Sequence, residues 1–570
     1  MLSDITITNE QINSLPLLVG IMEEMGIREL IDQHVTPHGH WQGTSVGTTL
    51  TIWLSHLLLE RDHRLVMVRD WAADRAQTIN ALLDITLRDT DCTDDRLANL
   101  LTMLGDPTTQ ATLDAAFLQH WLRVYHLPTE TVRLDSTSVS VYHDAVDADG
   151  LLQFGHSKDH RPDLRQFKAM LASLDPLGLP IACHPVAGQR ADDGLYVPAY
   201  TAAVKALGTA AVLVVGDSKM GALATRGQIV AGGSCYLCAY RPPSATDEIA
   251  GWIEQALTRA EQWQTLDVLD ETTGELVPVA VLDVWTREQR WVDTATQQGT
   301  RWTERVLVVR SQQQQDGLRR RREEALMRVT ARLEALRQPP KQGRKRYRMA
   351  AELTDVVDEV IAAAGLTGVV QADVREAILS NGTASWTVGC IWVDVAAWQA
   401  LIARLGWHLY VSNTTEAQYS AATLVGTYRQ QAVQERGFAR LKTRNLQIRP
   451  VYLRDEQRIA GLLWLLVLAL RVLVLTEQRL RARLEEREEG ITGLNPASRT
   501  QVTVRPTTER VLAAFGNITL TTIDGAGLKH RHVSPLNRTQ QHILDLLNLP
   551  ADLYDRLAES EPNSVLHLRE

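Results

Sequence analysis

The feature that most constrains the fold is a change of pattern at Thr131, where helical periodicity gives way to short β-rich runs. Three or four such runs predict an antiparallel meander of strands. They are followed by a helical segment, a wholly apolar strand that ends before Asp217, a second helical segment and a last strand, which is a β-α-β arrangement. The predicted class is therefore α/β. The β-rich runs span residues 131–142, 151–155, 166–175 and 178–186, and the later strands lie in 209–216 and 235–240.

The rest of the chain surrounds and interrupts this α/β segment. Its first part reads as a mainly helical domain, and a stretch with its own strands and a strongly basic helix looks inserted into the α/β domain. A strand and two long helices then return to the first domain, the first helix running from about Glu416 to Thr443 and the second from about Asp455 to Glu488. The predicted divisions are 1–128 (helical), 129–240 and 407–490 (the two parts of the α/β core), 241–406 (insertion) and 491–570 (C-terminal segment).

Charge is distributed unevenly along the 570 residues. The net charge of −9 comes entirely from residues 1–128, which hold 8 Arg against 17 Asp and Glu. Positive charge is concentrated between Arg319 and Arg348, where there are 12 Lys and Arg against 3 Glu, and between Tyr428 and Arg449. A basic run on its own is often a solvated helix face, but two runs near a group of acids favour contacts with nucleic-acid phosphates.

Composition and local pattern argue against export and against a membrane. The N-terminus lacks the basic start and apolar run of a signal peptide, and five scattered cysteines do not form a disulfide framework. The most apolar run, residues 461–475, is shorter than a bilayer span and is interrupted by Arg471. We expect a protein that stays inside the cell, with this run as a buried helix.

Three acids are the candidates for chemistry. Asp135 projects from a predicted strand, and Asp217 follows the apolar strand at the point where α/β sheets present ligand-binding groups. Glu435 shares a seven-residue spacing with Tyr428 and Lys442, which would put the three on one face of a continuous helix. Three carboxylates suit Mg²⁺ or Mn²⁺, and two such ions would support phosphoryl transfer, with Lys442 and neighbouring arginines holding phosphates. Taken singly, each acid could instead be a paired strand residue, a helix cap or half of a surface ion pair.

At these residues the chain resembles the DDE transposases of bacterial insertion sequences, in the insertion-sequence-four superfamily and its sixteen-thirty-four branch. The signature Tyr-x2-Arg-x3-Glu-x6-Lys reads here Tyr428-x2-Gln431-x3-Glu435-x6-Lys442. Residues 154–171, 177–193, 216–220 and 450–470 look like the same branch, so the resemblance covers most of the chain. It implies an RNase H-like catalytic core interrupted by an α+β insertion domain and preceded by a mainly helical N-terminal domain.

The resemblance also implies the reaction and its site. Metal-bound water would cleave DNA at the element end, and the freed 3′-hydroxyl would attack target DNA, with Mg²⁺ or Mn²⁺ as two ions. Partners would be double-stranded terminal repeats and target DNA, and the chain would act as a homodimer or larger assembly in the cytoplasm of a bacterium or archaeon, without a membrane. Asp135, Asp217 and Glu435 are the expected catalytic residues and metal ligands. The expected DNA contacts are Tyr428, Gln431, Lys442, Arg436, Arg440, Arg319, Arg320, Lys345, Arg346 and Trp302.

Several alternatives stay open. Gln431 stands where the signature has Arg, so a catalytically decayed or repurposed DNA-binding protein is one alternative, and a nuclease on the same fold is another. Trp291 and Trp302 could stack on an extruded base or pack in the core. A zinc site from His156, His160, Cys235 and Cys238, or a nucleophile pair from Cys183 and His184, is disfavoured because the residues lie on unlike segments or opposite strand faces.

Overall fold

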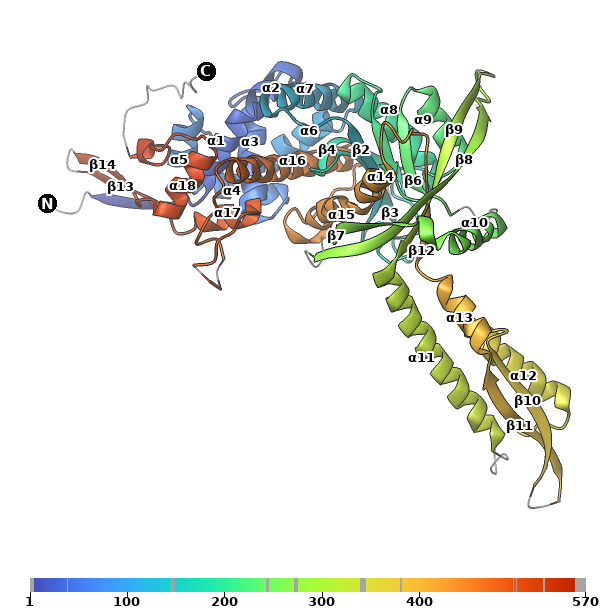
Figure 1. Ribbon diagram of the computed structural model, residues 1–570. Helices are drawn as coiled ribbons and strands as arrows, with labels where there is room; N and C mark the ends of the chain where they lie inside the picture. The colour runs from blue at the N-terminus through green and yellow to red at the C-terminus, as the bar shows by residue number, and fades with distance from the viewer. Residues whose placement is uncertain are drawn as a thin grey trace. The chain divides into compact units, whose positions relative to one another are not determined.

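The computed structural model describes residues 5–558, with gaps at 38, 145–146, 148, 242–245, 271–274, 339–344, 380–381, 496, 499 and 526–527. The chain forms two compact units (Figure 1). The first unit contains residues 1–236, 291–300 and 430–570, and the second contains 237–290 and 301–429. The predicted insertion therefore lies mostly in the second unit.

The first unit begins with a short strand and a series of helices. Helix α3 is buried along almost its whole length, and Ser45 caps its N-terminus by accepting a hydrogen bond from the backbone N–H of Thr48. Most of the elements in residues 1–128 are helices, in line with the expectation from the sequence. The elements are β1 (Thr6–Gln11), α1 (Leu15–Glu24), α2 (Ile27–His34), α3 (Val46–Glu60), α4 (Val68–Ala73), α5 (Ala76–Leu83), α6 (Asp94–Leu104) and α7 (Pro107–Tyr125).

A mixed sheet follows, in the strand order β4-β3-β2-β5 within the first unit. Strands β2, β3 and β4 pair antiparallel as the predicted meander, and β2 pairs parallel with β5. The run at 151–155 contributes one bridge, Gln153 to Gln166, and no strand of its own. The α/β class is confirmed. The elements are β2 (Thr131–Ser140), β3 (Gln166–Leu174), β4 (Leu179–Ala187), α8 (Tyr196–Leu207), β5 (Leu213–Gly216), α9 (Leu223–Ala231) and β6 (Cys235–Ala239), whose second half is in the second unit.

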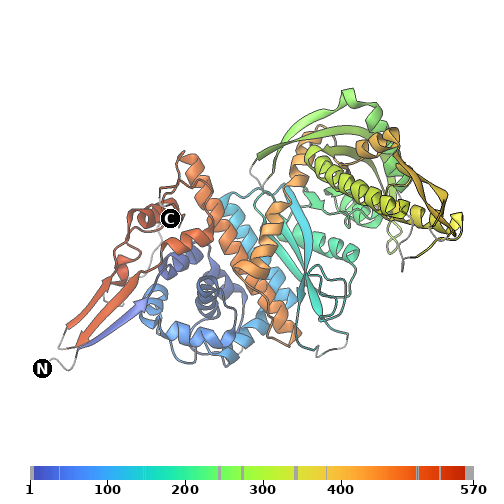
Figure 2. The same ribbon diagram turned by 90° about the horizontal axis from the view of Figure 1, so that it is seen from below.

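Helix α16 (Glu456–Glu486) is the central element of the first unit, between the N-terminal helices and the sheet (Figure 2). Among the described residues it is the one helix long and apolar enough to cross a bilayer, but its most apolar window is wholly buried in the protein. The expected buried helix over 461–475 is confirmed.

Two features fix α16 in place. A Cβ atom on Gly461 would lie 2.1 Å from the carbonyl oxygen of Leu101 on α6, and one on Gly105 would lie 2.0 Å from the carbonyl oxygen of Gln457, so only glycine permits this close helix crossing. Arg471 is buried and forms a 2.7 Å ion pair with Asp114 of α7.

The remaining elements of the first unit lie near the C-terminal part of the sequence. Strand β1 pairs antiparallel with β13 and β13 with β14, so a three-stranded sheet joins the two ends of the described chain. These elements are α15 (Ala432–Ala439), the π-helical turn η5 (Arg440–Arg444), α17 (Thr508–Ala514), β13 (Thr519–Gly525), β14 (Leu528–Val533) and α18 (Arg538–Leu546).

The second unit contains an antiparallel sheet with the order β6-β12-β9-β8-β7. Its centre is the apolar run Val306 to Val309 of β9, which is fully buried. The elements here are α10 (Thr246–Thr258), β7 (Gln264–Asp270), β8 (Glu275–Val292, whose last two residues fall in the first unit), β9 (Gly299–Ser311), β12 (Trp407–Ser412) and α14 (Ala421–Arg429).

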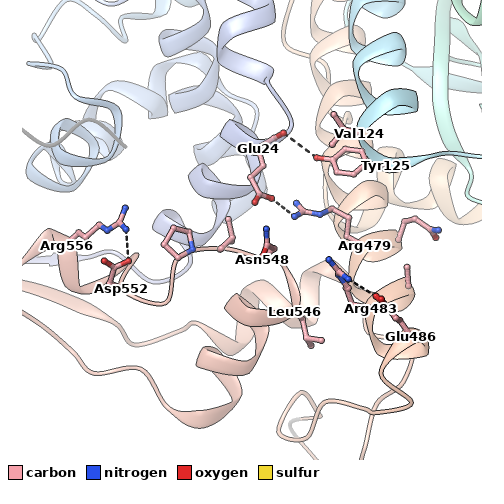
Figure 3. A pocket seen from close by; sticks show the side chains of 14 residues that line it. Glu24, Val124, Tyr125, Arg479, Arg483, Glu486, Leu546, Asn548, Asp552 and Arg556 are labelled. Atoms are coloured by element: carbon pink, nitrogen blue, oxygen red, sulfur yellow. Dashed lines mark hydrogen bonds and ion pairs between the residues drawn. The ribbon is translucent and has the colours of Figure 1, made fainter. Parts of the chain in front are cut away.

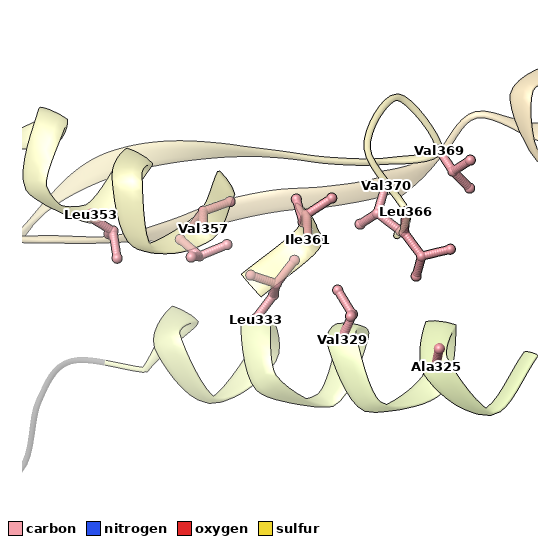
Figure 4. Packing of buried hydrophobic residues seen from close by; sticks show 10 residues of the cluster. Ala325, Val329, Leu333, Leu353, Val357, Ile361, Leu366, Val369 and Val370 are labelled. Atoms are coloured by element: carbon pink, nitrogen blue, oxygen red, sulfur yellow. The ribbon is translucent and has the colours of Figure 1, made fainter. Parts of the chain in front are cut away.

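The basic helix α11 (Gln312–Arg337) belongs to a subdomain with its own core (Figure 4). Ala325, Val329 and Leu333 lie on one face of α11 and point towards Val357 and Ile361 of the neighbouring helix. Most arginines of α11, including Arg319 and Arg320, are exposed, but Arg322 lies on the side that faces the core and donates a 2.9 Å hydrogen bond to the carbonyl oxygen of Ala364. The partners of α11 are α12 (Ala350–Ala363), β10 (Val370–Ile378), β11 (Ala384–Val393) and α13 (Val395–Ala403).

Candidate active site

Asp135 lies in the middle of β2, a strand that is otherwise almost wholly buried. Its side chain is 20% exposed, so the carboxylate reaches the surface at one point of a buried strand. The backbone N–H of Ser136 donates a 2.7 Å hydrogen bond to Asp135 Oδ1, which fixes one of the two oxygens.

Asp217 lies beside Asp135 because of the register of two parallel strands. Arg133 of β2 is level with Val215 of β5, and each aspartate follows its strand residue by two positions. Adjacent strands are about 4.8 Å apart, and residues two apart share a face, so the two carboxylates lie on the same side of the sheet. Asp217 comes directly after the last residue of β5, at the carboxyl end of the strand.

Asp217 is oriented by two donors. The phenol of Tyr196, on α8, donates a 2.5 Å hydrogen bond to Asp217 Oδ1, and the backbone N–H of Lys219 donates one of 2.8 Å to the same oxygen. Tyr196 is buried, and burial together with the neighbouring Asp217 raises the pKa of its phenol. The phenol therefore stays protonated and acts as a donor.

The electrostatics of Asp135 reflect its surroundings. Burial raises the pKa of this carboxyl above its ordinary value, and the negative charge of Asp217 raises it further. The ammonium of Lys158, 3.4 Å from Asp135 Oδ1, acts in the opposite direction. Two carboxylates this close are the arrangement that a divalent cation stabilises.

Glu435 lies on α15, which packs beside β2 in the first unit. The prediction of one helix from about Glu416 to Thr443 is wrong: α14 ends at Arg429, a turn occupies Gln430 and Gln431, and α15 continues into a π-helical turn. Tyr428, Glu435 and Lys442 therefore do not share the face of a single helix. The sequence does not predict this interruption, because both turn residues are glutamines, which are good helix formers, and neither Gly nor Pro stands there.

Gln431, which stands in the place of the signature arginine, directly precedes α15, and its side chain faces Glu435 on that helix. Its Nε2 donates a 3.3 Å hydrogen bond to Glu435 Oε1. The interaction spans one helical turn, from the residue before α15 to the fourth residue of the helix. Gln431 therefore contacts Glu435 in this structure.

A loop between β2 and β3 brings further charges to these acids. The ammonium of Lys158 donates a 2.6 Å hydrogen bond to the carbonyl oxygen of Ser136 and faces Asp135. The next residue, Asp159, accepts a 2.8 Å hydrogen bond from Lys442 at one oxygen and a 3.0 Å bond from Arg449 at the other. The Lys442 and Asp159 side chains are only 12% and 14% exposed, so this ion pair is largely shielded from water.

Two more predicted DNA contacts lie in the first unit. Arg436 is exposed on α15. Arg440 is 13% exposed and forms ion pairs with Glu477 of α16 and Glu509 of α17. Its guanidinium is therefore committed to the packing of η5 against these helices.

The other predicted DNA contacts lie in the second unit. Tyr428 packs against Tyr410 with ring centroids 4.2 Å apart. Trp302 is buried in β9, at 7% exposure, as the packing alternative expects. Trp291, in the first unit, packs against Gly227 of α9. The predicted basic contacts differ in their surroundings. Arg319 and Arg320 are exposed on α11. The ammonium of Lys345 lies 5.2 Å from the centre of the Tyr347 ring, and Arg346 donates a hydrogen bond to the carbonyl oxygen of Ala384; residues 339–344 of the basic stretch lie outside the described residues.

The donor set can be tested for a divalent cation. The hydrogen bonds of Asp135 and Asp217 go to Oδ1 in each case, and from the described residues the Oδ2 atoms receive none. Hard carboxylate oxygens in a partly buried position suit Mg²⁺ or Mn²⁺. Across the described part of the chain, however, no three His, Cys, Asp or Glu side chains lie close enough together to hold a metal ion. Asp135 and Asp217 lie at neighbouring positions after the paired residues Arg133 and Val215, but the two aspartates and Glu435 do not form such a group of three in this structure.

The disfavoured sequence alternatives gain no support from the structure. Cys183 is buried, and burial raises the pKa of its thiol well above the ordinary value, which opposes nucleophilic chemistry. His156, His160, Cys235 and Cys238 do not form a metal-binding group among the described residues.

A cavity of about 960 Å³ lies elsewhere in the first unit, near the C-terminal end of α16 (Figure 3). Its arginines face acids: Arg479 pairs with Glu24, and Arg483 lies 2.7 Å from Glu486. These charges neutralise one another, so the cavity does not match the acidic and basic pattern of the site around Asp135.

Four residues of the site were missed by sequence reasoning. Lys158 and Asp159 lie in a segment that the sequence marked only as part of a resemblance, Tyr196 begins a segment marked only as helical, and Arg449 follows the signature by seven residues. A polar Lys-Asp pair in a loop gives no local signal of its partners, because Lys442 lies 283 residues further along the chain.

Comparison with known proteins gives one family. A family model described as "Transposase DDE domain" matches residues 127–472, which is more than half of the chain. No curated protein matches the sequence. The matched segment begins just before β2 and ends within α16, so it includes all three candidate acids.

Proposed function

The chain belongs to the transposase DDE domain family, and on that premise we propose that it cleaves DNA at the ends of an insertion sequence and transfers the freed 3′-hydroxyl to target DNA. The main support for the proposal is the placement of Asp135 and Asp217, each two residues after the paired strand residues Arg133 and Val215. Such a carboxylate pair suits phosphoryl transfer, which depends on positioning and on electrostatic stabilisation.

Mg²⁺ or Mn²⁺, as two ions, is the proposed cofactor. Asp135 and Asp217 would hold it, with Glu435 as the third ligand. When bound, the ions would activate the attacking oxygen and stabilise the leaving oxygen of the phosphodiester.

The protein's own residues would position these groups. Tyr196 and the backbone N–H of Lys219 fix the orientation of Asp217, and the backbone N–H of Ser136 fixes that of Asp135. Lys442 would contact a DNA phosphate close to Glu435. Exposed arginines on α11, including Arg319 and Arg320, would make sequence-independent contacts with the DNA backbone, and the protein would work as a homodimer or larger assembly in the cytoplasm.

The test is cleavage of a labelled duplex that carries the terminal repeat of the encoding element, with Mg²⁺ or Mn²⁺. The wild-type protein should cut at the repeat end and Glu435→Gln should not, while Glu485→Gln, an exposed residue at the end of α16, should cut normally. A strand-transfer assay with a pre-cleaved end separates a transposase from a nuclease, since only a transposase joins that end to target DNA.

One observation favours a second candidate, a decayed or repurposed DNA-binding protein. Gln431 supplies no charge where the signature has an arginine, and it contacts Glu435. Tight binding of the repeat without cleavage by the wild type, together with cleavage by Gln431→Arg, would support this second candidate.

A further inference from the structure

The loop between β2 and β3 presents two consecutive charged residues to two different parts of the site. Lys158 faces Asp135, and Asp159 lies between Lys442 and Arg449. A positive charge thus stands beside a proposed metal ligand, and a negative charge stands beside a proposed phosphate contact. Lys158 therefore supplies the positive charge that a metal cation would bring to Asp135, and Asp159 supplies the negative charge that a DNA phosphate would bring to Lys442 and Arg449.

The contacts of Asp159 resemble those of a bound phosphate. One carboxylate oxygen accepts from an ammonium at 2.8 Å and the other from a guanidinium at 3.0 Å, which is how lysine and arginine share an anion with two or more oxygens. The two cations come from η5 and from the segment after it, whereas Asp159 comes from the loop between β2 and β3. Since Lys442 is mostly buried, its charge needs a partner in the absence of DNA.

The contacts of Lys158 resemble those of a cation ligated by oxygen. Its ammonium lies within 3.4 Å of three oxygens: Asp135 Oδ1, the carbonyl oxygen of Ser136 and Ser136 Oγ. Its side chain is 33% exposed, so it can leave this position at low cost. Because Lys158 and Asp159 are adjacent, a movement that removes one from its contacts disturbs the other.

We infer that this loop holds the DNA-free active site in a self-occupied state, in which Asp159 takes the place of a backbone phosphate at Lys442 and Arg449, and Lys158 takes the place of the divalent cation at Asp135. An incoming DNA phosphate displaces Asp159, and the loop then withdraws Lys158 and opens Asp135 to the metal. Arg449 becomes a second phosphate contact. The inference rests on the proposed function, and it couples DNA binding to metal binding.

The experiment measures binding by the full-length protein, without cleavage. The affinity for a short duplex of unrelated sequence is measured by fluorescence anisotropy, and the affinity for Mn²⁺ alone by electron paramagnetic resonance. Asp159→Asn should bind the duplex about fivefold to tenfold more tightly, since two cations lose their internal partner. The matched control is Asp163→Asn in the same loop, whose carboxylate pairs with Arg161 at 2.7 Å and contacts neither cation, and it should not change either affinity.

Lys158→Met tests the other half of the loop. Loss of the ammonium should tighten Mn²⁺ binding about fivefold, and the duplex should no longer increase Mn²⁺ affinity as it does in the wild type, because the coupling is reciprocal. In the wild type, the duplex should also increase amide hydrogen exchange in residues 157–160, a readout that needs no variant to fold.

Unchanged duplex affinity in Asp159→Asn, unchanged or weaker Mn²⁺ binding in Lys158→Met, or unchanged hydrogen exchange would each overturn the inference. These readouts are independent of catalysis. If DNA binding and Mn²⁺ binding are coupled but repeat DNA is not cleaved, the inference stands and the proposed function fails. If repeat DNA is cleaved but the two binding events are not coupled, the proposed function stands and the inference fails.

Discussion

The phenol of Tyr196 donates a 2.5 Å hydrogen bond to Oδ1 of Asp217, and the tyrosine is buried against the glycine that precedes this aspartate. A buried donor to a carboxylate is among the stronger hydrogen bonds in proteins. The orientation of the second acid therefore depends on a helix that contributes no carboxylate to the site.

Tyr196→Phe should lower the rate of metal-dependent cleavage about tenfold, because a hydrogen bond to a charged group contributes roughly 1.5 kcal/mol or more. The fold should remain, since the ring still fills its place. Tyr200→Phe is the matched control: it lies one turn later on α8, and its hydroxyl contacts Ser234 at 2.9 Å instead of an acid. Equal cleavage rates for the two variants would contradict this role of Tyr196.

Arg471→Met should lower the free energy of unfolding by about 3–5 kcal/mol, because it leaves Asp114 as an unpaired buried charge. Thermal or denaturant unfolding measures the change. Arg487→Met, which removes a 2.6 Å pair with exposed Asp545, should cost less than about 1 kcal/mol. A similar decrease in the free energy of unfolding in both variants would show that burial of the Arg471–Asp114 pair does not determine its contribution to stability.

Gly461→Ala should destabilise the first unit by roughly 1–3 kcal/mol, since its Cβ would meet the backbone of α6 and force the helices apart. The control is Gly317→Ala on α11, where a Cβ meets nothing within 4 Å and where alanine favours the helix. The melting temperatures should therefore shift in opposite directions, and a rise for Gly461→Ala would refute the close crossing.

The stability of the second unit should fall between about pH 6.5 and pH 4. Burial, aided by Arg241 and Arg429, lowers the pKa of His408 to about 4. Below pH 6.5 the unfolded chain binds a proton that the folded protein does not, so stability present above pH 6.5 is lost as the pH falls towards 4. The loss should be about 1–3 kcal/mol after allowance for partial exposure.

His408→Gln tests this assignment. Glutamine cannot titrate, so the variant should lose part of the pH dependence in thermal melts recorded from pH 7 to pH 4. If the wild type and the variant lose stability in parallel across this range, His408 is not the group responsible.

The strands that hold the site can be predicted from the sequence, but the contacts between segments that are distant in the sequence cannot. The sequence predicts Asp135 within a strand and Asp217 directly after one, and the structure agrees at both positions, because alternation and apolar runs are local signals. The turn at Gln430 and Gln431 was missed, since two helix-forming residues gave no sign of an interruption. The pairing of Asp159 with Lys442 could not be foreseen either, because nothing local selects a partner so far along the chain.

The hydrogen bonding of β1 to β13 has a consequence for how the protein is made. Residues 6–11 leave the ribosome before the second unit, but their partner strand, residues 519–525, emerges only after the whole second unit has been translated. The edge of β1 therefore remains without its partner while the second unit is translated, and the three-stranded sheet can form only after residues 519–525 have emerged. A premature stop before residue 519 would leave this strand unpaired, open to association with other chains.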